Sequence, residues 1–351
     1  MTDQQKIAIV GAGSLLGKEL NDALADSPFG EADFILMDDE AELGSLEAVG
    51  DEVTFIQRID PSSFRHVDFA FFAGDEQLTL KHWENANKAG ASIVDLSFAL
   101  EGKPGVLVRA PWIDGELQPI PAQPGSEAPG LETPAIVPAQ PVAVALALLL
   151  GRVAQSTPIR IASATVLEPA SEYGRAALDE LHQQTVKLLS FQELPRQVYD
   201  TQVAFNTTPS FGDSAKFSLA TSESRIRRHF ALLSAGRLPD VGVQLLHAPV
   251  FHGYGISLSM ELATPVSLDQ MEASLAGEHV EIVTAESDPP TNLTVAGQGN
   301  ILVRVRPHNT REPETTRFWI WAGLDNLRFA TLNALACALE LKRLRPSGKV
   351  Q

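Results

Sequence analysis

The sequence predicts an α/β protein of two domains: a Rossmann-like N-terminal domain, and an α+β domain with a mixed, largely antiparallel sheet. Its 351 residues, 44% of them hydrophobic, are enough for two packed cores. The N-terminal part alternates short apolar runs with helical patterns, which is typical of a parallel sheet covered on both faces. A stretch rich in Pro and Gly at 118–130 then separates it from a part dominated by β-type runs.

Apolar periodicity places the N-terminal elements. Strands are expected at 6–10, 34–37, 68–74 and 91–96, and helices at 18–24 and 78–89. We expect residues 1–135 to form a Rossmann-like NAD(P)-binding domain, which a C-terminal helix within 325–351 completes.

Residues 136–324 are expected to form a dimerisation and former substrate domain. The expected helices are 141–150, 172–189, 223–233 and 328–343, and the expected strands are 159–167, 198–205, 243–246, 255–262, 280–283 and 316–323. The runs 256–262 and 318–322 carry more large apolar side chains than one packed sheet face needs. This predicts a homodimer, with coverage of both faces within one chain as the alternative.

Composition excludes several classes of protein. The formal net charge of −17, with no run of Lys or Arg, argues against a nucleic-acid partner. The single cysteine, Cys337, excludes an internal disulfide and is expected to be a small buried residue of the last helix. The start of the chain has no secretory pattern and the apolar stretch 142–150 is too short to span a bilayer, so we expect a cytoplasmic protein without a membrane partner. No His, Cys and Asp cluster has metal-ligand spacing.

A glycine-rich turn follows the first strand and indicates phosphate binding at a helix N-terminus. Its expected cofactor-binding residues are Gly11, Ala12, Gly13, Ser14, Leu15 and Gly17, joined by Ala73 and Gly74 at the end of the third strand. The third glycine comes one residue later than in G-x-G-x-x-G, so a purely structural turn is the alternative.

Acidic residues follow the second strand, at Asp38, Asp39 and Glu40. Carboxylates here accept hydrogen bonds from ribose hydroxyls and repel a 2′-phosphate, which favours NAD over NADP if a nucleotide binds. A solvated acidic loop is the alternative, and no cofactor is required.

Several motifs in order along the chain resemble the aspartate-semialdehyde dehydrogenase family, whose reaction belongs to amino-acid biosynthesis. The run 93–100 is similar to V-I-D-N-S-S-A-F, 248–254 to V-P-V-F-V-G-H, and 325–334 to D-N-L-R-K-G-A-A-L-N. The strand and turn at 7–12 and the weaker match at 204–209 extend the resemblance over nearly the whole chain.

The resemblance implies a cysteine nucleophile and a histidine base, and both are changed here. The cysteine falls on Gln140 and the histidine on Tyr254, so thiol chemistry is not available. The family's substrate-binding arginines fall on His247 and Glu101.

The family's helix motif is altered as well, and in it only Arg225 keeps its character. This motif, E-E-x-K, falls on Ser222 to Arg225, and Asn326 is added to the cofactor-binding residues. The glutamine of T-Y-Q falls near Leu167, with a one-residue slip left open.

Two functions follow from these substitutions. The first is a catalytically inactive, dimeric binding or interaction protein that keeps a nucleotide pocket, with an unidentified small molecule or protein as its partner. The second is an NAD(P)-dependent oxidoreductase that acts on an aldehyde or semialdehyde without a thioester. In the second, Tyr254 or His252 donates the proton, because residues i and i+2 of a strand share a face.

Overall fold

The computed structural model describes residues 5–39, 46–49, 52–117, 128–309 and 311–346. The chain forms two compact units, of which the first comprises Met1–Trp112, Ile120–Ala139 and Ala330–Gln351 and the second Ile113–Pro119 and Gln140–Phe329. One unit contains a parallel sheet and the other a mixed sheet, so the predicted fold class is confirmed.

The first unit is built on a seven-stranded sheet in the order β5-β2-β1-β6-β7-β9-β8, and every pairing in it is parallel. Its strands are β1 (Lys6–Val10), β2 (Asp33–Asp38), β5 (Gln57–Arg58), β6 (Phe69–Phe72), β7 (Ser92–Asp95), β8 (Leu107–Arg109) and β9 (Ala135–Pro138). A hairpin of β3 (Leu46–Val49) and β4 (Glu52–Phe55), absent from the prediction, forms a separate small sheet.

Alternate residues of these strands enter two different cores, because both faces of a parallel sheet are covered. One core contains Ile7 and Ile9 together with α1 (Leu15–Ala25) and α8 (Asn326–Leu344). The other contains Ala8 and Val10 together with η1 (Pro61–Phe64) and α2 (Glu76–Lys88). Cys337 lies fully buried in the first core, as the sequence predicted.

The second unit is built on a six-stranded sheet in the order β11-β10-β12-β15-β14-β13. Its strands are β10 (Ile159–Glu168), β11 (Val241–His247), β12 (Tyr254–Val266), β13 (Val280–Ile282), β14 (Ile301–Pro307) and β15 (Thr315–Leu324). The pairs β10/β11 and β13/β14 are parallel, and the three central pairs are antiparallel. The sheet is therefore mixed, and the sequence analysis missed β14.

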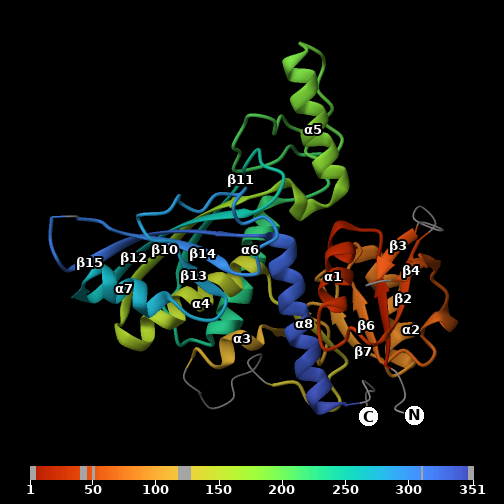
Figure 1. Cartoon of the computed structure of the whole chain (residues 1–351). Helices are drawn as coiled ribbons and strands as arrows, with labels where there is room; N and C mark the ends of the chain where they lie inside the picture. The colour runs from red at the N-terminus through yellow and green to blue at the C-terminus, as the bar shows by residue number, and fades with distance from the viewer. Residues whose placement is uncertain (1–4, 40–45, 50–51, 118–127, 310, 347–351) are drawn as a thin grey trace. The chain divides into compact units, whose positions relative to one another are not determined.

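The second unit also contains the helices α4 (Pro141–Ser156), α5 (Arg175–Leu189), α6 (Leu219–Ser234), α7 (Leu268–Leu275) and the short η2 (Ala170–Tyr173). The short helix α3 (Pro111–Asp114) has residues in both units. Figure 1 shows α4, α6 and α7 on one side of the long strands, whereas α5 extends away from the sheet. No helix in the described part of the chain is long and apolar enough to cross a membrane.

The two faces of this sheet differ in character. Ile256, Leu258 and Met260 of β12 are all buried on one face, whereas the serines between them are only partly buried on the other. The apolar side chains of the run 256–262 are therefore buried within one chain. The expectation that this run leaves apolar surface for a dimer contact is wrong. The less buried face instead exposes Trp319 by 39% and Ile161 by 62%.

The expected strand at 198–205 is wrong, because this segment is a loop. Two side chains of α5 bind its backbone and replace a strand partner. Glu180 accepts the N–H groups of Gln197, Val198 and Tyr199, at 2.7 to 3.1 Å. Gln184 accepts those of Val203 and Ala204, at 2.8 and 3.2 Å. The polar backbone is thus satisfied without a ladder.

Candidate functional site

Gln140 lies at the N-terminus of α4, a helix that begins with Pro141 and is buried on nearly every side. Its side-chain Oε1 accepts the N–H groups of Val142 and Ala143, at 2.7 and 3.1 Å. Its Nε2 donates to the Tyr254 hydroxyl at 3.1 Å, and its backbone N–H donates to Nδ1 of His229 at 2.9 Å. Both ends of the amide therefore have structural partners, and the carbonyl end acts as a helix cap.

Tyr254 opens β12 and is fully buried. Its hydroxyl donates to Oε1 of Glu168 over a long 3.5 Å, while the Tyr173 hydroxyl donates to Oε2 of the same carboxyl at 2.7 Å. The Tyr173 and Ser222 oxygens lie 3.3 Å apart. A continuous hydrogen-bonded network thus runs from Gln140 to Ser222.

Two carboxyls, the fully buried Glu168 and the partly buried Glu172, dominate the electrostatics of this network. Burial, and then the charge of Glu172, raises the pKa of Glu168 well above its usual range. Burial also raises the pKa of Glu172, and burial with both carboxylates raises the pKa of Tyr254. The Tyr254 phenol therefore holds its proton at neutral pH and does not act as a base.

Asn326 belongs to the same unit and extends the network. Its Oδ1 accepts from the Ser171 hydroxyl at 3.0 Å and from the N–H of Gly253 at 3.3 Å, and its Nδ2 donates to Glu172 at 3.3 Å. The amide predicted to contact a cofactor thus holds a carboxyl and a loop in place.

His247, at the end of β11, is fully buried among aromatic rings. The ring centroids of Tyr199, Phe211 and Tyr173 lie 5.0, 5.2 and 6.5 Å from its own. Neither of its ring nitrogens has a hydrogen-bond partner among the described residues, and burial lowers the pKa of His247 to about 4. It is therefore neutral at pH 7 and does not bind an anion by charge.

The other predicted substrate-binding residues, Ser222, Arg225 and Glu101, are divided between the two units. Ser222 and Arg225 are on α6, where Ser222 joins the network and the charge of Arg225 lowers the pKa of Glu172. Glu101 is half-buried in the turn after β7, in the first unit.

The expectation that His252 and Tyr254 lie on the same face of a strand is wrong, because His252 is not in a strand. The strand β12 begins only at Tyr254, and the intervening Gly253 has φ +85°, so the i and i+2 rule does not apply.

Sequence reasoning missed Glu168, Glu172, Tyr173 and His229. Glu168, the residue after Leu167, accepts hydrogen bonds from the hydroxyls of Tyr173 and Tyr254. The run E-P-A-S-E-Y at 168–173, with its two carboxyls in an apolar neighbourhood, was the available signal. Among the residues the structure describes, no group of three or more His, Cys, Asp or Glu side chains is placed to hold a metal ion.

The glycine turn of the first unit is tightly built. A Cβ at Gly11, where φ is +84°, would lie 2.3 Å from the N of Gly74, and a Cβ at Gly17 would lie 2.2 Å from the O of Gly11. The glycine that comes one residue late therefore allows close packing of α1 on the turn. Ser14 Oγ donates to Ala73 O and accepts from Gly17 N, both at 2.8 Å.

An internal carboxylate already occupies part of this turn. The N–H of Gly13 donates to Oδ2 of Asp38 at 2.8 Å, and Asp38 is only 7% exposed. A dinucleotide's pyrophosphate approaches a Rossmann turn at its second glycine. The second glycine therefore does not offer its N–H to a bound pyrophosphate, and the turn does not fit one at this donor. Glu40 lies outside the described residues.

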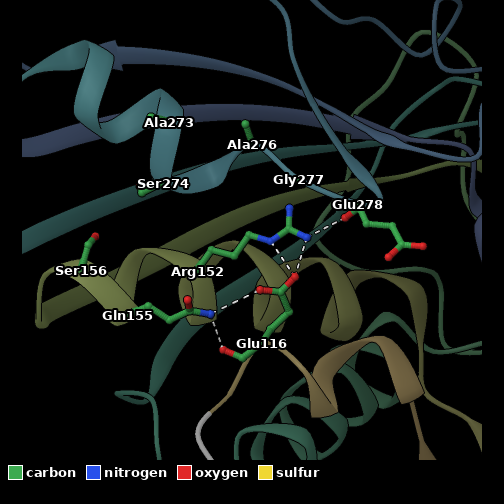
Figure 2. A pocket seen from close by; sticks show the side chains of 9 residues that line it. All are labelled: Glu116, Arg152, Gln155, Ser156, Ala273, Ser274, Ala276, Gly277 and Glu278. Atoms are coloured by element: carbon green, nitrogen blue, oxygen red, sulfur yellow. Dashed lines mark hydrogen bonds and ion pairs between the residues drawn. The ribbon is translucent and has the colours of Figure 1, made fainter.

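A surface pocket of about 490 Å³ lies around Arg152 in the second unit. Figure 2 shows the side chains that line it. The Arg152 guanidinium pairs with Glu116 at 2.6 Å and donates to the carbonyls of Leu275 and Glu278, at 3.0 and 2.6 Å. These contacts tie α4 to the segment after α7. The pocket therefore surrounds an ion pair whose contacts are structural.

Family models match most of the chain. The semialdehyde dehydrogenase NAD binding domain matches residues 6–138, and the semialdehyde dehydrogenase dimerisation domain matches residues 150–329.

Relatives match over nearly their whole length. The chain is 30% identical to a USG-1 protein homolog from Pseudomonas aeruginosa, over 95% of this chain and 97% of that one. It is 26% identical to an aspartate-semialdehyde dehydrogenase from Rickettsia bellii, over 97% and 98%.

A solved structure agrees with the fold. The structure of a probable aspartate-semialdehyde dehydrogenase from Pseudomonas aeruginosa superimposes with a TM-score of 0.80 at 27% identity, covering 97% of this chain and 98% of that one. The chain therefore belongs to the semialdehyde dehydrogenase family and has aspartate-semialdehyde dehydrogenases among its relatives.

Proposed function

We propose that this chain is a non-catalytic member of its family that acts as a dimeric binding or interaction protein. The observation that supports this most strongly is the state of Gln140. A carboxamide is not a nucleophile, and this one is buried with both ends hydrogen-bonded.

The surroundings of Gln140 support the same proposal. Tyr254 keeps its proton, and its hydroxyl donates to the carboxyl of Glu168. Anionic acyl phosphates need arginine forks, and His247 offers a neutral ring. The single thiol of the chain, Cys337, lies in the core of the first unit.

The alternative is an oxidoreductase that transfers hydride without a thioester, with Tyr254 or His252 as the proton donor. Its support is weaker, because the phenol of Tyr254 is fully buried and His252 precedes the strand. Affinity for a nicotinamide nucleotide together with turnover of any aldehyde would favour this alternative.

The proposal includes the finer features expected from the sequence. The NAD(P)-binding domain comprises 1–135 with 325–351, and 136–324 is the dimerisation domain. The protein is a cytoplasmic homodimer that binds neither nucleic acid nor membrane, and NAD binds more tightly than NADP where either binds. The family's dimerisation domain at 150–329 and the exposed Trp319 support the dimer.

The test is an assay of the purified protein with aspartate semialdehyde, NADP or NAD, and phosphate. We expect no reduced nucleotide above a blank without protein. An active relative assayed in parallel verifies the substrates, and turnover by this chain refutes the proposal.

A double substitution tests whether the loss extends beyond two residues. Gln140→Cys with Tyr254→His restores the family's nucleophile and base, but His247 and Glu101 still lack the arginine fork. We expect rates far below those of the active relative. Near-native rates would show that the arginine positions matter little.

A further inference from the structure

The turn between β1 and α1 uses most of its N–H groups internally. Those of Gly11 and Ala12 donate to Met37 O at 2.8 and 3.2 Å, and that of Ser14 donates to Gly11 O at 3.1 Å. Gly13 donates to Asp38. Within the described residues, only Leu15 and Leu16 keep first-turn N–H groups without an acceptor.

Asp38 contacts this turn through one of its carboxylate oxygens. Oδ2 accepts from Gly13 N at 2.8 Å, and Oδ1 accepts from the N–H of Asp39 at 2.9 Å. A carboxylate that binds ribose hydroxyls at the end of the second strand needs an oxygen that faces the ligand. Oδ2 of Asp38 instead accepts from the turn, and Asp38 is buried whereas the neighbouring Asp39 is exposed.

We propose that Asp38 is an internal anion that competes with the pyrophosphate of a dinucleotide for the phosphate end of this turn. The chain carries its family's NAD binding domain, so the turn has the right place in the fold. Its second glycine, however, already donates to a negative charge, and two anions at one turn repel each other. Asp38 is thus a specificity-determining residue that lowers the affinity for dinucleotides. The inference rests on the nucleotide-pocket part of the proposed function and does not depend on catalysis.

The experiment compares Asp38→Asn with the wild-type protein by calorimetric titration. The asparagine keeps an acceptor for Gly13 N and removes the charge. We expect the affinity for NAD to rise roughly tenfold or more at low ionic strength, because removal of a like charge within a few ångströms has an effect of about this size. Asp39→Asn, which removes the same charge from an exposed neighbour, should change the affinity by less than about threefold.

Inorganic pyrophosphate is the second probe, because it lacks ribose. If Asp38 acts at the phosphate end, Asp38→Asn increases the affinity for pyrophosphate as well as for NAD. Weaker NAD binding by Asp38→Asn would instead assign Asp38 to the ribose and overturn the proposal. Unchanged binding, or no binding by either protein, would overturn it too, since removal of the charge would then not open the turn.

Folding is checked independently of binding. Far-UV circular dichroism and thermal unfolding of both asparagine variants should match the wild type. The variant Asp38→Ser, which removes the charge and has a shorter side chain that can still accept a hydrogen bond, is titrated with NAD and pyrophosphate in the same way. Gain of affinity is a result that misfolding does not produce. Aldehyde turnover would refute the proposed lack of catalysis. It would not bear on the role of Asp38, which the titrations test separately.

Discussion

Replacement of Gln140 by alanine should destabilise the second unit strongly. The variant loses the helix cap, which contributes about 1 kcal/mol in typical proteins. The cap consists of the bonds from the N–H groups of Val142 and Ala143, and the variant also removes the amide that donates to the buried Tyr254 hydroxyl. An unsatisfied buried group costs about 1–3 kcal/mol. Together these give a loss of roughly 2–4 kcal/mol in the free energy of unfolding.

Urea denaturation of both proteins, followed by circular dichroism and tryptophan fluorescence, measures this loss. Gln183→Ala is the matched control, because Gln183 is an exposed residue in the middle of α5. We expect the control to remain within about 0.5 kcal/mol of the wild type. A loss of under about 0.5 kcal/mol for Gln140→Ala would refute the view that the amide is a structural element of the site.

Three further predictions concern the second unit. The pKa of Glu168 is raised on folding, so the folded state holds a proton that the unfolded state releases above about pH 4.3. Stability should fall as pH rises above that value, and Glu168→Gln should lessen the fall in unfolding measurements from pH 5 to 8. The pKa of His247 is lowered to about 4, so stability should fall as pH decreases from about 6.5 to 4, and His247→Phe should flatten this acid limb in the same assay. In light scattering the wild type should exceed the mass of one 37.8 kDa chain, whereas Trp319→Glu should shift the protein toward that mass.

The fold could be read from the sequence because its strongest elements are periodic. The strand at 6–10, the glycine turn and the helix after it follow local rules, and the structure contains all of them. The strand expected at 198–205 failed because its stabilisation is not local. Glu180 and Gln184 lie on α5, and no pattern within the segment shows that they bind its backbone.

The site was predictable at the positions that carry a motif and not beyond them. Gln140 and Tyr254 could be placed by resemblance, and the structure joins them by a hydrogen bond. Glu168 and Glu172 were missed because their importance depends on burial, which a sequence of alternating polar and apolar residues at a strand end does not reveal. Asp38 was expected to face a ribose, but the rule for its position says nothing of the rotamer that turns it toward Gly13.

The substitutions in the network depend on one another. The amide of Gln140 donates to the phenol of Tyr254, and that phenol donates to Glu168, so each group satisfies a neighbour that is also changed from the family pattern or was not part of it. Return of the cysteine alone would remove the amide that donates to a buried phenol, and return of the histidine alone would remove the phenol that joins Gln140 to Glu168. Each single step toward the family's catalytic pair therefore costs stability before any activity is gained. Under the proposed function the site is retained for its structure, so binding and assembly are the properties to measure first.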